Sequence, residues 1–345
     1  MGKALAGEFL PARLAFEEAD AAFASVEVVA PGTSSGVVAP GLQTDTVAPG
    51  LQTDTVAPGL QTDTVAPGLQ TRRLSALCFD GPEEQLLLTE TTQPAILATS
   101  IAAWRVLAAE GVRPAYVAGH SLGEYSANVA AGTFAFGDAV SLVRRRGRYM
   151  QEAVPLGTGA MAAILGAELE IVRQACEEAA QGEVVSPANI NGPGQIVIAG
   201  HAGAVQRASE RAKALGARRA ITLPVSAPFH CALMKPAEER LEPELRGLAT
   251  CDPSVPVVAN VDGQVKRDGR SAVDALVRQV SSPVRWEDVV RRLASEGVTT
   301  YVEVGPGSVL SGLVKKIHKD AHVVTFGSPE DLGAIMAACS ISTEK

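Results

Sequence analysis

A strand that turns into a helix within three residues is the feature that most constrains this chain. Residues 115–118 (AYVA) predict a short buried strand, and residues 122–131 predict a helix that begins directly after Gly119-His120-Ser121. An Ala-rich apolar helix is predicted over 93–109, and a further helix over 138–152. Strands that alternate with helices in this way indicate an α/β fold with a mostly parallel sheet.

The rhythm of the pattern changes between residues 158 and 223. The order there is strand (AMAAIL), helix (LEIVRQACEEAA), strand (VVSPANIN), strand (QIVIAG), helix (AVQRASERAKAL) and strand (RRAITLPV), with the turn NGPG between the two central strands. This βαββαβ order predicts a small ferredoxin-like subdomain inserted into a larger one. The large α/β subdomain then comprises residues 74–157 and 224–330. Its later predicted elements are helices at 234–248, 271–280, 286–297 and 308–317 and strands at 300–304 and 322–326.

A nine-residue repeat separates the N-terminal helix from this dense pattern. The tetrapeptide VAPG begins at positions 29, 38, 47, 56 and 65. Each copy contains a Pro and a Gly, which disfavour a helix or a central strand, and it offers little apolar surface to a core. We therefore predict a helix within residues 1–25, a flexible linker over 26–73 and a C-terminal tail over 331–345. A small solenoid of stacked repeats is the alternative for the linker.

Charge and cysteine usage exclude several classes of protein. The formal net charge is -8 at pH 7, and phosphate attraction needs clustered Lys and Arg, so we expect no nucleic-acid partner. The five cysteines are scattered without metal-ligand spacing, which favours reduced thiols in the cytoplasm over disulfides or a metal site. We expect no membrane span, because no run of about 18 apolar residues occurs.

Ser121 stands where a nucleophile elbow would place it, between Gly119 and Gly123 and between a strand and a helix. The tight turn exposes the serine above the sheet. The helix that begins there points its free N–H groups toward it, and these can stabilise an oxyanion. The alternative is an ordinary Gly-rich turn, but the flanking strand and helix favour the elbow.

A serine nucleophile needs a general base, and His230 is the leading candidate. It lies in the segment PVSAPFHCALM, a loop between a strand and a helix, where such sheets place catalytic groups. His120 directly precedes Ser121, so its side chain is expected to point away from the serine hydroxyl. His201 is predicted in a turn and His318 at a solvated helix end. A purely structural role is the alternative for a single loop histidine such as His230.

Several motifs, taken in order, carry a resemblance to a known family. They are GHSLGEYSA (119–127), RRRGRYMQEAVP (144–155), NGPGQIVIAG (191–200), VSAPFHCALMKPA (225–237), VRQVSSPVRW (277–286) and EVGPGSVLSGLVKKI (303–317). Together they resemble malonyl-CoA:acyl-carrier-protein transacylases and, in part, the acyltransferase domains of polyketide and fatty-acid synthases. The resemblance runs from Leu74 to Phe326 and also covers residues 1–24. It implies a hydrolase-like α/β core with a ferredoxin-like insert.

The resemblance assigns a role to five residues. Ser121 matches the nucleophile that forms the malonyl ester, and His230 matches the general base and acid. Gln279 matches the residue that helps to hold this histidine in place of a triad carboxylate. Leu122 matches the residue whose backbone N–H contributes to the oxyanion hole. Arg146 matches the arginine that grips the free carboxylate of malonate, which a planar guanidinium can hold bidentately.

Three further residues match positions near the acyl pocket. Phe229 resembles the bulky residue of malonyl-selective members and should leave little room for an α-methyl branch. Asn191 and Gln195 match a turn beside the acyl group, although NGPG also serves simply as a hairpin turn. The remaining arginines of the RRRGR cluster, which are Arg144, Arg145 and Arg148, are expected on a solvated helix face.

The resemblance therefore implies transfer of malonyl from malonyl-CoA to the phosphopantetheine thiol of acyl carrier protein, in fatty-acid or polyketide synthesis. Coenzyme A enters only as the carrier of the substrate, and no metal or redox cofactor is implied. We expect a cytoplasmic monomer. An impaired homologue that serves as a scaffold and a serine hydrolase that passes the acyl group to water are the alternatives.

The chain departs from the family pattern at its start. Family members begin with a short strand and a GQGSQ loop that supplies a second oxyanion N–H, whereas Met1 aligns with the methionine just after that loop. We therefore expect one oxyanion donor in the chain as printed, and weak transfer, since loss of one donor typically costs about 10²–10³ in turnover.

Overall fold

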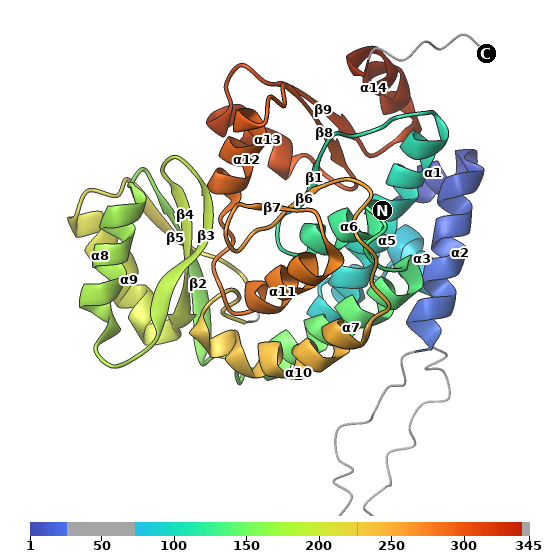
Figure 1. Ribbon diagram of the computed structural model, residues 1–345. Coiled ribbons are helices and arrows are strands. Elements are labelled where there is room, and N and C mark those ends of the chain that lie inside the picture. The colour runs from blue at the N-terminus through green and yellow to red at the C-terminus, as the bar shows by residue number, and fades with distance from the viewer. Residues whose placement is uncertain (26–72, 226, 340–345) are drawn as a thin grey trace, which may run out of the picture.

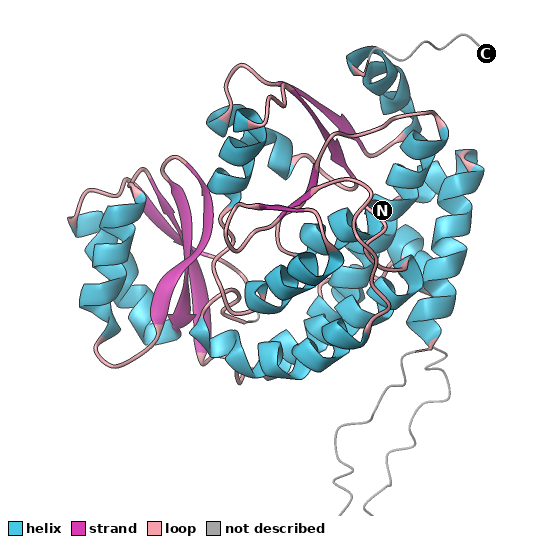
Figure 2. Ribbon diagram, in the orientation of Figure 1, coloured by secondary structure: helices cyan, strands magenta, loops and turns pink. Residues whose placement is uncertain are grey.

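Figure 1 shows the computed structural model of the chain, which describes residues 1–25, 73–225 and 227–339. A small subdomain carries one sheet and two helices, and a larger subdomain beside it is mostly helical (Figures 1 and 2). The predicted linker over 26–73 lies outside the described residues except for Arg73. Among the described residues, no helix is long and apolar enough to cross a membrane.

The small subdomain has the predicted βαββαβ order. Its elements are β2 (Gly159–Leu165), α8 (Leu169–Ala180), β3 (Val185–Gly192), β4 (Gln195–His201), α9 (Ala202–Ala214) and β5 (Arg219–Thr222). The strands are ordered β3-β4-β2-β5 and every neighbouring pair is antiparallel, which is the ferredoxin-like arrangement. Val172 and Cys176 of α8 and Val205 of α9 are buried against Ile196 and Ile198 of β4. Both helices therefore cover one face of the sheet (Figure 2).

The large subdomain has few and short strands. Strand β1 (Val117–Ala118) pairs in parallel with β6 (Val257–Val258), which pairs antiparallel with β7 (Val265–Lys266). Strand β8 (Thr300–Val304) pairs in parallel with β9 (His322–Phe326). The α/β class is confirmed. The expected parallel sheet is divided into two separate sheets, one of β1, β6 and β7 and one of β8 and β9. Strands β6 and β7 escaped prediction because two residues are too few to show an alternating pattern.

Helices make up most of the large subdomain and enclose its core. They are α1 (Lys3–Glu8), α2 (Leu10–Ala24), α3 (Leu74–Asp80), α4 (Glu83–Leu86), α5 (Thr89–Ala109), α6 (Leu122–Ala130), α7 (Phe136–Glu152), α10 (Lys235–Gly247), α11 (Gly269–Gln279), α12 (Trp286–Ser295), α13 (Val309–Ile317) and α14 (Leu332–Ala338). Helix α5 runs through the centre, and its Leu97, Ile101 and Val106 are buried with Phe16 of α2 and Leu142 of α7. The Ala-rich sequence of α5 lets these neighbours approach closely.

The two ends of the chain differ from the prediction. The N-terminal helix is interrupted at Phe9, whose extended backbone separates α1 from α2, and Pro11 then lies in the first turn of α2. The expected tail over 331–345 is wrong for its first half. Helix α14 occupies that stretch and buries Ile335 and Met336, while residues 340–345 lie outside the described residues.

One segment joins the two subdomains next to the elbow. Asn189 of β3 forms an isolated parallel bridge with Val284. The N–H of Ile190 donates to the Val284 carbonyl, and the N–H of Val284 donates to the Ala188 carbonyl, each at 2.8 Å. Strand β3 is therefore fixed to the loop that leads from α11 to α12. This loop begins one residue after Gln279, which belongs to the candidate site described below.

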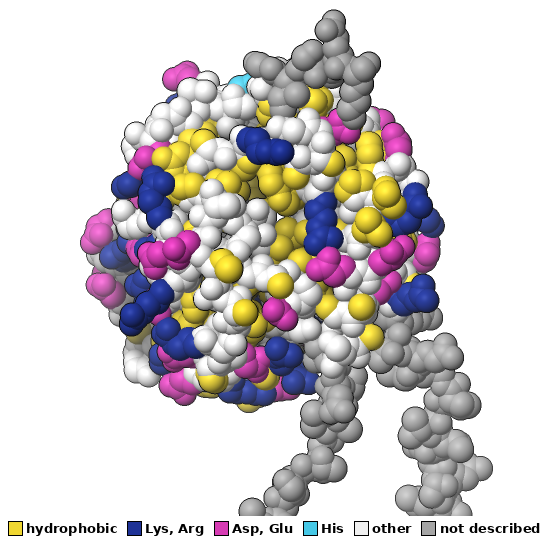
Figure 3. Space-filling view, turned by 45° about the vertical axis from the view of Figure 1, so that its right-hand side comes forward, with side chains coloured by type: hydrophobic (Ala, Val, Ile, Leu, Met, Phe, Trp, Pro, Cys, Tyr) yellow, Lys and Arg dark blue, Asp and Glu magenta, His cyan; other side chains and the backbone are white. Residues whose placement is uncertain are grey.

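Surface charges of both signs lie side by side on the face shown in Figure 3, with hydrophobic side chains between them. Many surface cations of the described residues are paired, for example Arg240 with Glu152 at 2.7 Å and Arg246 with Asp274 at 2.6 Å. Exposed pairs of this kind contribute little each, typically about 0–1 kcal/mol. The stability of the fold therefore rests mainly on its buried core.

Close packing of α5 against α7 predicts that Gly147→Ala is destabilising. A Cβ atom at Gly147 would lie 2.5 Å from the carbonyl oxygen of Thr89, so the helices would have to separate. We expect a loss of about 1–3 kcal/mol in the free energy of unfolding, measured by urea denaturation. Gly137→Ala in the same helix is the matched control, because its Cβ would meet only Ala22 at 3.7 Å. Equal midpoints for the two variants would contradict this packing argument.

Candidate active site

The turn between β1 and α6 is a strained nucleophile elbow. Ser121 precedes α6 with φ 52° and ψ -108°, a conformation that costs a non-glycine residue about 1–3 kcal/mol. Asn260 holds the turn from two sides. Its Oδ1 accepts the Ser121 N–H at 2.7 Å, and its Nδ2 donates to the Gly119 carbonyl at 2.8 Å. The surrounding hydrogen bonds thus keep the serine in a conformation that it would not adopt alone.

His230 is positioned to act as a base toward Ser121. Its Nε2 lies 2.7 Å from Ser121 Oγ, and its Nδ1–H donates to the main-chain carbonyl of Gln279 at 3.0 Å. This second bond fixes the tautomer, so Nε2 is the free acceptor. Burial, together with the charge of Arg146, lowers the pKa of His230 to about 3. The imidazole is therefore neutral at pH 7 and able to accept the serine proton.

Arg146 is buried beside the serine, with 1% of its surface exposed. Its guanidinium donates to Gln93 Oε1 at 2.7 Å, to Gln279 Oε1 at 3.0 Å and to Ser121 Oγ at 3.2 Å. Within the described part of the chain no carboxylate pairs with it, and its Nε has no hydrogen-bond partner. The site thus holds a buried cation whose Nε–H group is free to donate to a ligand.

The other arginines of the cluster are half-buried and paired, so the solvated helix face expected for them is only partly present. Arg145 forms an ion pair with Glu244, and Arg148 lies 3.9 Å from Glu152. Arg144 donates to the Phe23 carbonyl. Helix α7 thus presents Arg146 to the interior, whereas the other three arginines lie at its partly exposed edge.

The structure brings some of the remaining predicted residues to the site but not all. Leu122 begins α6, and its N–H meets no acceptor among the described residues, so it remains available to an oxyanion. Phe229 is half-buried and packs against the cores of both subdomains. Asn191 Oδ1 lies 2.8 Å from His120 Nε2, so His120 points to the small subdomain rather than to Ser121. Gln195 instead accepts from exposed Lys316 at 3.0 Å.

Sequence reasoning missed three buried polar residues of the site: Gln93, Glu124 and Asn260. Each is 7% exposed or less, and each contacts a predicted site residue directly. Glu124 had a local signal, because it follows Ser121 by one helical turn. The other two come from distant segments, and only the tertiary structure brings them to the elbow.

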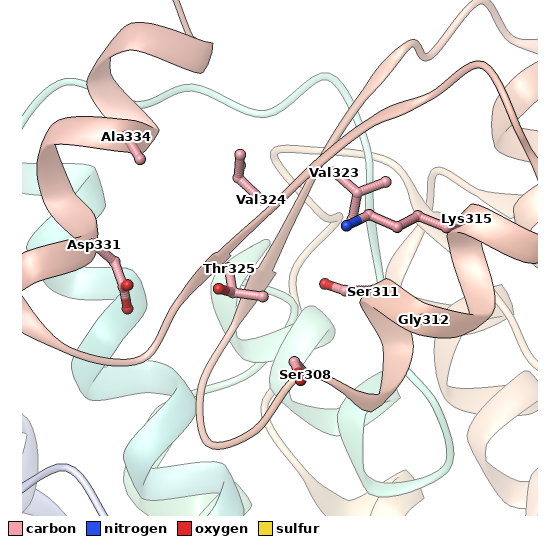
Figure 4. A pocket seen from close by; sticks show the side chains of 9 residues that line it. All are labelled: Ser308, Ser311, Gly312, Lys315, Val323, Val324, Thr325, Asp331 and Ala334. Carbon is pink, nitrogen blue, oxygen red and sulfur yellow. The ribbon is translucent and has the colours of Figure 1, made fainter.

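A separate pocket of about 430 Å³ opens between α13, β9 and α14 (Figure 4). Its lining residues are Ser308, Ser311, Gly312, Lys315, Val323, Val324, Thr325, Asp331 and Ala334. Asp331 accepts there from the N–H groups of Gly327 and Ser328. The lining includes none of Ser121, Arg146, His230 and Gln279, so the pocket is distinct from the candidate site.

Comparison with known proteins identifies the family. Residues 51–329 match the acyl transferase domain family. The Malonyl CoA-acyl carrier protein transacylase of Salmonella typhimurium is 52% identical over 264 residues, which cover 76% of this chain and 85% of that protein. The protein of the same name from Bacillus subtilis is 49% identical over 261 residues, which cover 75% and 82%. The chain belongs to the malonyl-CoA:acyl-carrier-protein transacylase family.

Solved structures agree with this transacylase assignment. An acyl carrier protein S-malonyltransferase from Vibrio cholerae superposes with a TM-score of 0.82 at 42% identity and covers 97% of this chain and 94% of that one. A type II PKS acyl-carrier protein in complex with its malonyl-transacylase gives a TM-score of 0.81 at 40% identity, with 98% and 94% covered. The predicted family and the α/β class are thus confirmed.

The geometry of the transacylase elbow predicts that a side chain is tolerated at one of its two glycines and not at the other. A Cβ atom at Gly119 would lie 2.1 Å from the carbonyl carbon of Gly123, whereas a Cβ at Gly123 would meet nothing within 4 Å. Gly119→Ala should lower the free energy of unfolding by about 1–3 kcal/mol and slow the labelling of Ser121 by a fluorophosphonate probe. Gly123→Ala is the matched control and should keep both properties. Similar labelling rates in the two variants would refute the steric argument.

Proposed function

We propose that this chain transfers a malonyl group from malonyl-CoA to the phosphopantetheine thiol of acyl carrier protein through an ester on Ser121. The observation that carries the proposal is the arrangement at Ser121 Oγ, where a neutral imidazole lies 2.7 Å away and an arginine without a carboxylate partner lies 3.2 Å away. The names of the relatives and the complex of a related transacylase with its carrier protein support both substrates.

In the first half-reaction, Ser121 Oγ attacks the thioester carbonyl of malonyl-CoA while His230 Nε2 accepts the serine proton. The Leu122 N–H stabilises the oxyanion of the tetrahedral intermediate. When the intermediate collapses, the carbon–sulfur bond breaks, and the imidazolium returns its proton to the departing thiolate of coenzyme A. The malonyl group is left as an ester on Ser121.

The second half-reaction repeats these steps with a new thiol. His230 removes the proton of the phosphopantetheine thiol, and the sulfur attacks the ester carbonyl. The ester bond breaks, and the imidazolium protonates Ser121 Oγ as it leaves. Coenzyme A takes part only as a thioester carrier, and no step uses a further cofactor.

Arg146 selects the acyl group by charge. A buried guanidinium with a spare donor can form charge-assisted bonds to the free carboxylate of malonate, and it gains nothing comparable from a neutral acyl chain. Phe229 directly precedes His230 in the sequence and packs against both cores. Its ring restricts the space beside the α-carbon of the acyl group. A cytoplasmic location belongs to the proposal, because all five cysteines are free thiols, as in a reducing compartment.

Intact-mass measurement tests the ester directly. Wild-type protein mixed with malonyl-CoA should gain the mass of one malonyl group, and peptide mapping should place it on Ser121. Ser121→Ala should gain none, because its side chain offers no nucleophile. A variant that acquires the same mass at the wild-type rate would exclude Ser121 as the nucleophile. Release of free malonate without transfer to a carrier protein would instead indicate a hydrolase.

Arg146→Ala should reduce malonyl loading much more than acetyl loading. The lost bonds to a charged group are worth about 1.5–3 kcal/mol, or about 10- to 150-fold in rate. Single-turnover loading from malonyl-CoA and acetyl-CoA measures the ratio. Arg148→Ala in the same helix is the control, because its side chain lies on the surface side of α7. Equal losses for both acyl groups in Arg146→Ala would refute the carboxylate clamp.

A further inference from the structure

Glu124 is a buried carboxylate beside the nucleophile that the reaction described above does not use. It lies in the first turn of α6 with 1% of its surface exposed. Among the described residues it forms no ion pair. Its Oε2 instead accepts from Gln279 Nε2 at 2.7 Å and from the Asn260 N–H at 3.0 Å. Burying a carboxylate against neutral donors is costly, so a role for the charge itself is a better explanation than stability.

Gln279 connects this carboxylate with the reacting groups. Its Nε2 also donates to the Ser121 carbonyl at 3.0 Å, and its Oε1 accepts from Arg146 at 3.0 Å. Its main-chain carbonyl accepts from His230 at 3.0 Å. A shift of Gln279 would therefore disturb the nucleophile, the base and the guanidinium together.

The charge of Glu124 strengthens the orientation of the Gln279 amide that Arg146 and the Ser121 carbonyl also favour. A primary amide has a donor end and an acceptor end, whereas an ionised carboxylate only accepts and a guanidinium only donates. With Glu124 ionised, Nε2 must face the carboxylate and Oε1 must face Arg146. The reversed amide would place two acceptors together at one end and two donors together at the other. The anion thus adds a charge-assisted acceptor to the orientation that holds Arg146.

Glu124 is also the group in this cluster that titrates near neutral pH. Burial raises its pKa to about 7, against the opposing hydrogen bonds from Asn260 and Gln279. The other charged or titratable groups around it are Arg146 of α7, Asp262 of the loop after β6, Tyr125 of α6, His120 and His230. Burial lowers the pKa of both histidines and raises that of Tyr125 to about 12. Between about pH 6.5 and pH 8.5, a change in this cluster is therefore a change at Glu124.

We propose that Glu124 is a positioning residue of the transfer reaction: its carboxylate orients the Gln279 amide and thereby aims Arg146 at the free carboxylate of the acyl group. The inference rests on the proposed function. The ionised form is the competent one, because protonation removes the anionic acceptor of the amide. Malonyl loading should therefore fall as the pH falls through about 7.

Single-turnover loading of Ser121 from malonyl-CoA, measured as release of coenzyme A between about pH 6.5 and pH 8.5, tests the inference. No thiol needs to ionise in this half-reaction, so carrier-protein titration does not interfere. Wild-type loading should rise across the range. Glu124→Gln should be about tenfold to a hundredfold slower at pH 8, with a flat profile and a reduced preference for malonyl over acetyl. Glu124→Asp, which keeps the charge, should retain the rise.

Glu170→Gln is the matched control, because Glu170 is an exposed carboxylate in the first turn of α8. It should behave as wild type. If Glu124→Gln keeps the wild-type rate and profile, this inference fails while the proposed function stands. If wild type itself does not load malonyl, the proposed function fails and takes this inference with it. If both Glu124 variants melt early and lose loading equally at every pH, Glu124 is only structural and the inference is overturned.

Discussion

The candidate site depends on the hydrogen bonds of one buried residue, Gln279. It ends α11, yet it contacts the elbow after β1, the loop that carries His230 and the middle of α7. These segments lie far apart in the sequence, and no covalent or metal link joins them among the described residues. One neutral amide and its own backbone carbonyl therefore set the spacing of nucleophile, base and cation.

Two opposite charges lie buried on either side of that amide without touching. Glu124 and Arg146 each bond to Gln279, and neither neutralises the other directly. A direct ion pair would be the cheaper way to bury both charges, but it would leave the guanidinium already satisfied. The separation keeps the positive field available at Ser121 Oγ, where an anionic acyl group would lie.

The sequence predicted the local features of the site better than the long-range ones. Ser121 and its elbow follow from a strand, two glycines and a helix that are adjacent in the chain. His230 could be proposed because it lies in a loop between a strand and a helix. Asn260 offered no such signal. It follows a strand of only two residues, and the flanking sequence shows no alternation of apolar and polar residues that would predict a strand there. The helix α14 was missed for a similar reason, since seven residues with one buried face resemble a tail.

The low basicity of His230 has a consequence for the direction of the reaction. Because the pKa of His230 is lowered to about 3, the imidazolium formed in each half-reaction readily returns its proton to the departing group. The protein then has the same protonation state before and after each acyl exchange. The protonation of His230 therefore does not favour one thiol carrier over the other. The net flow of malonyl groups is therefore set by the relative supply of the two thioesters and by whatever consumes the product.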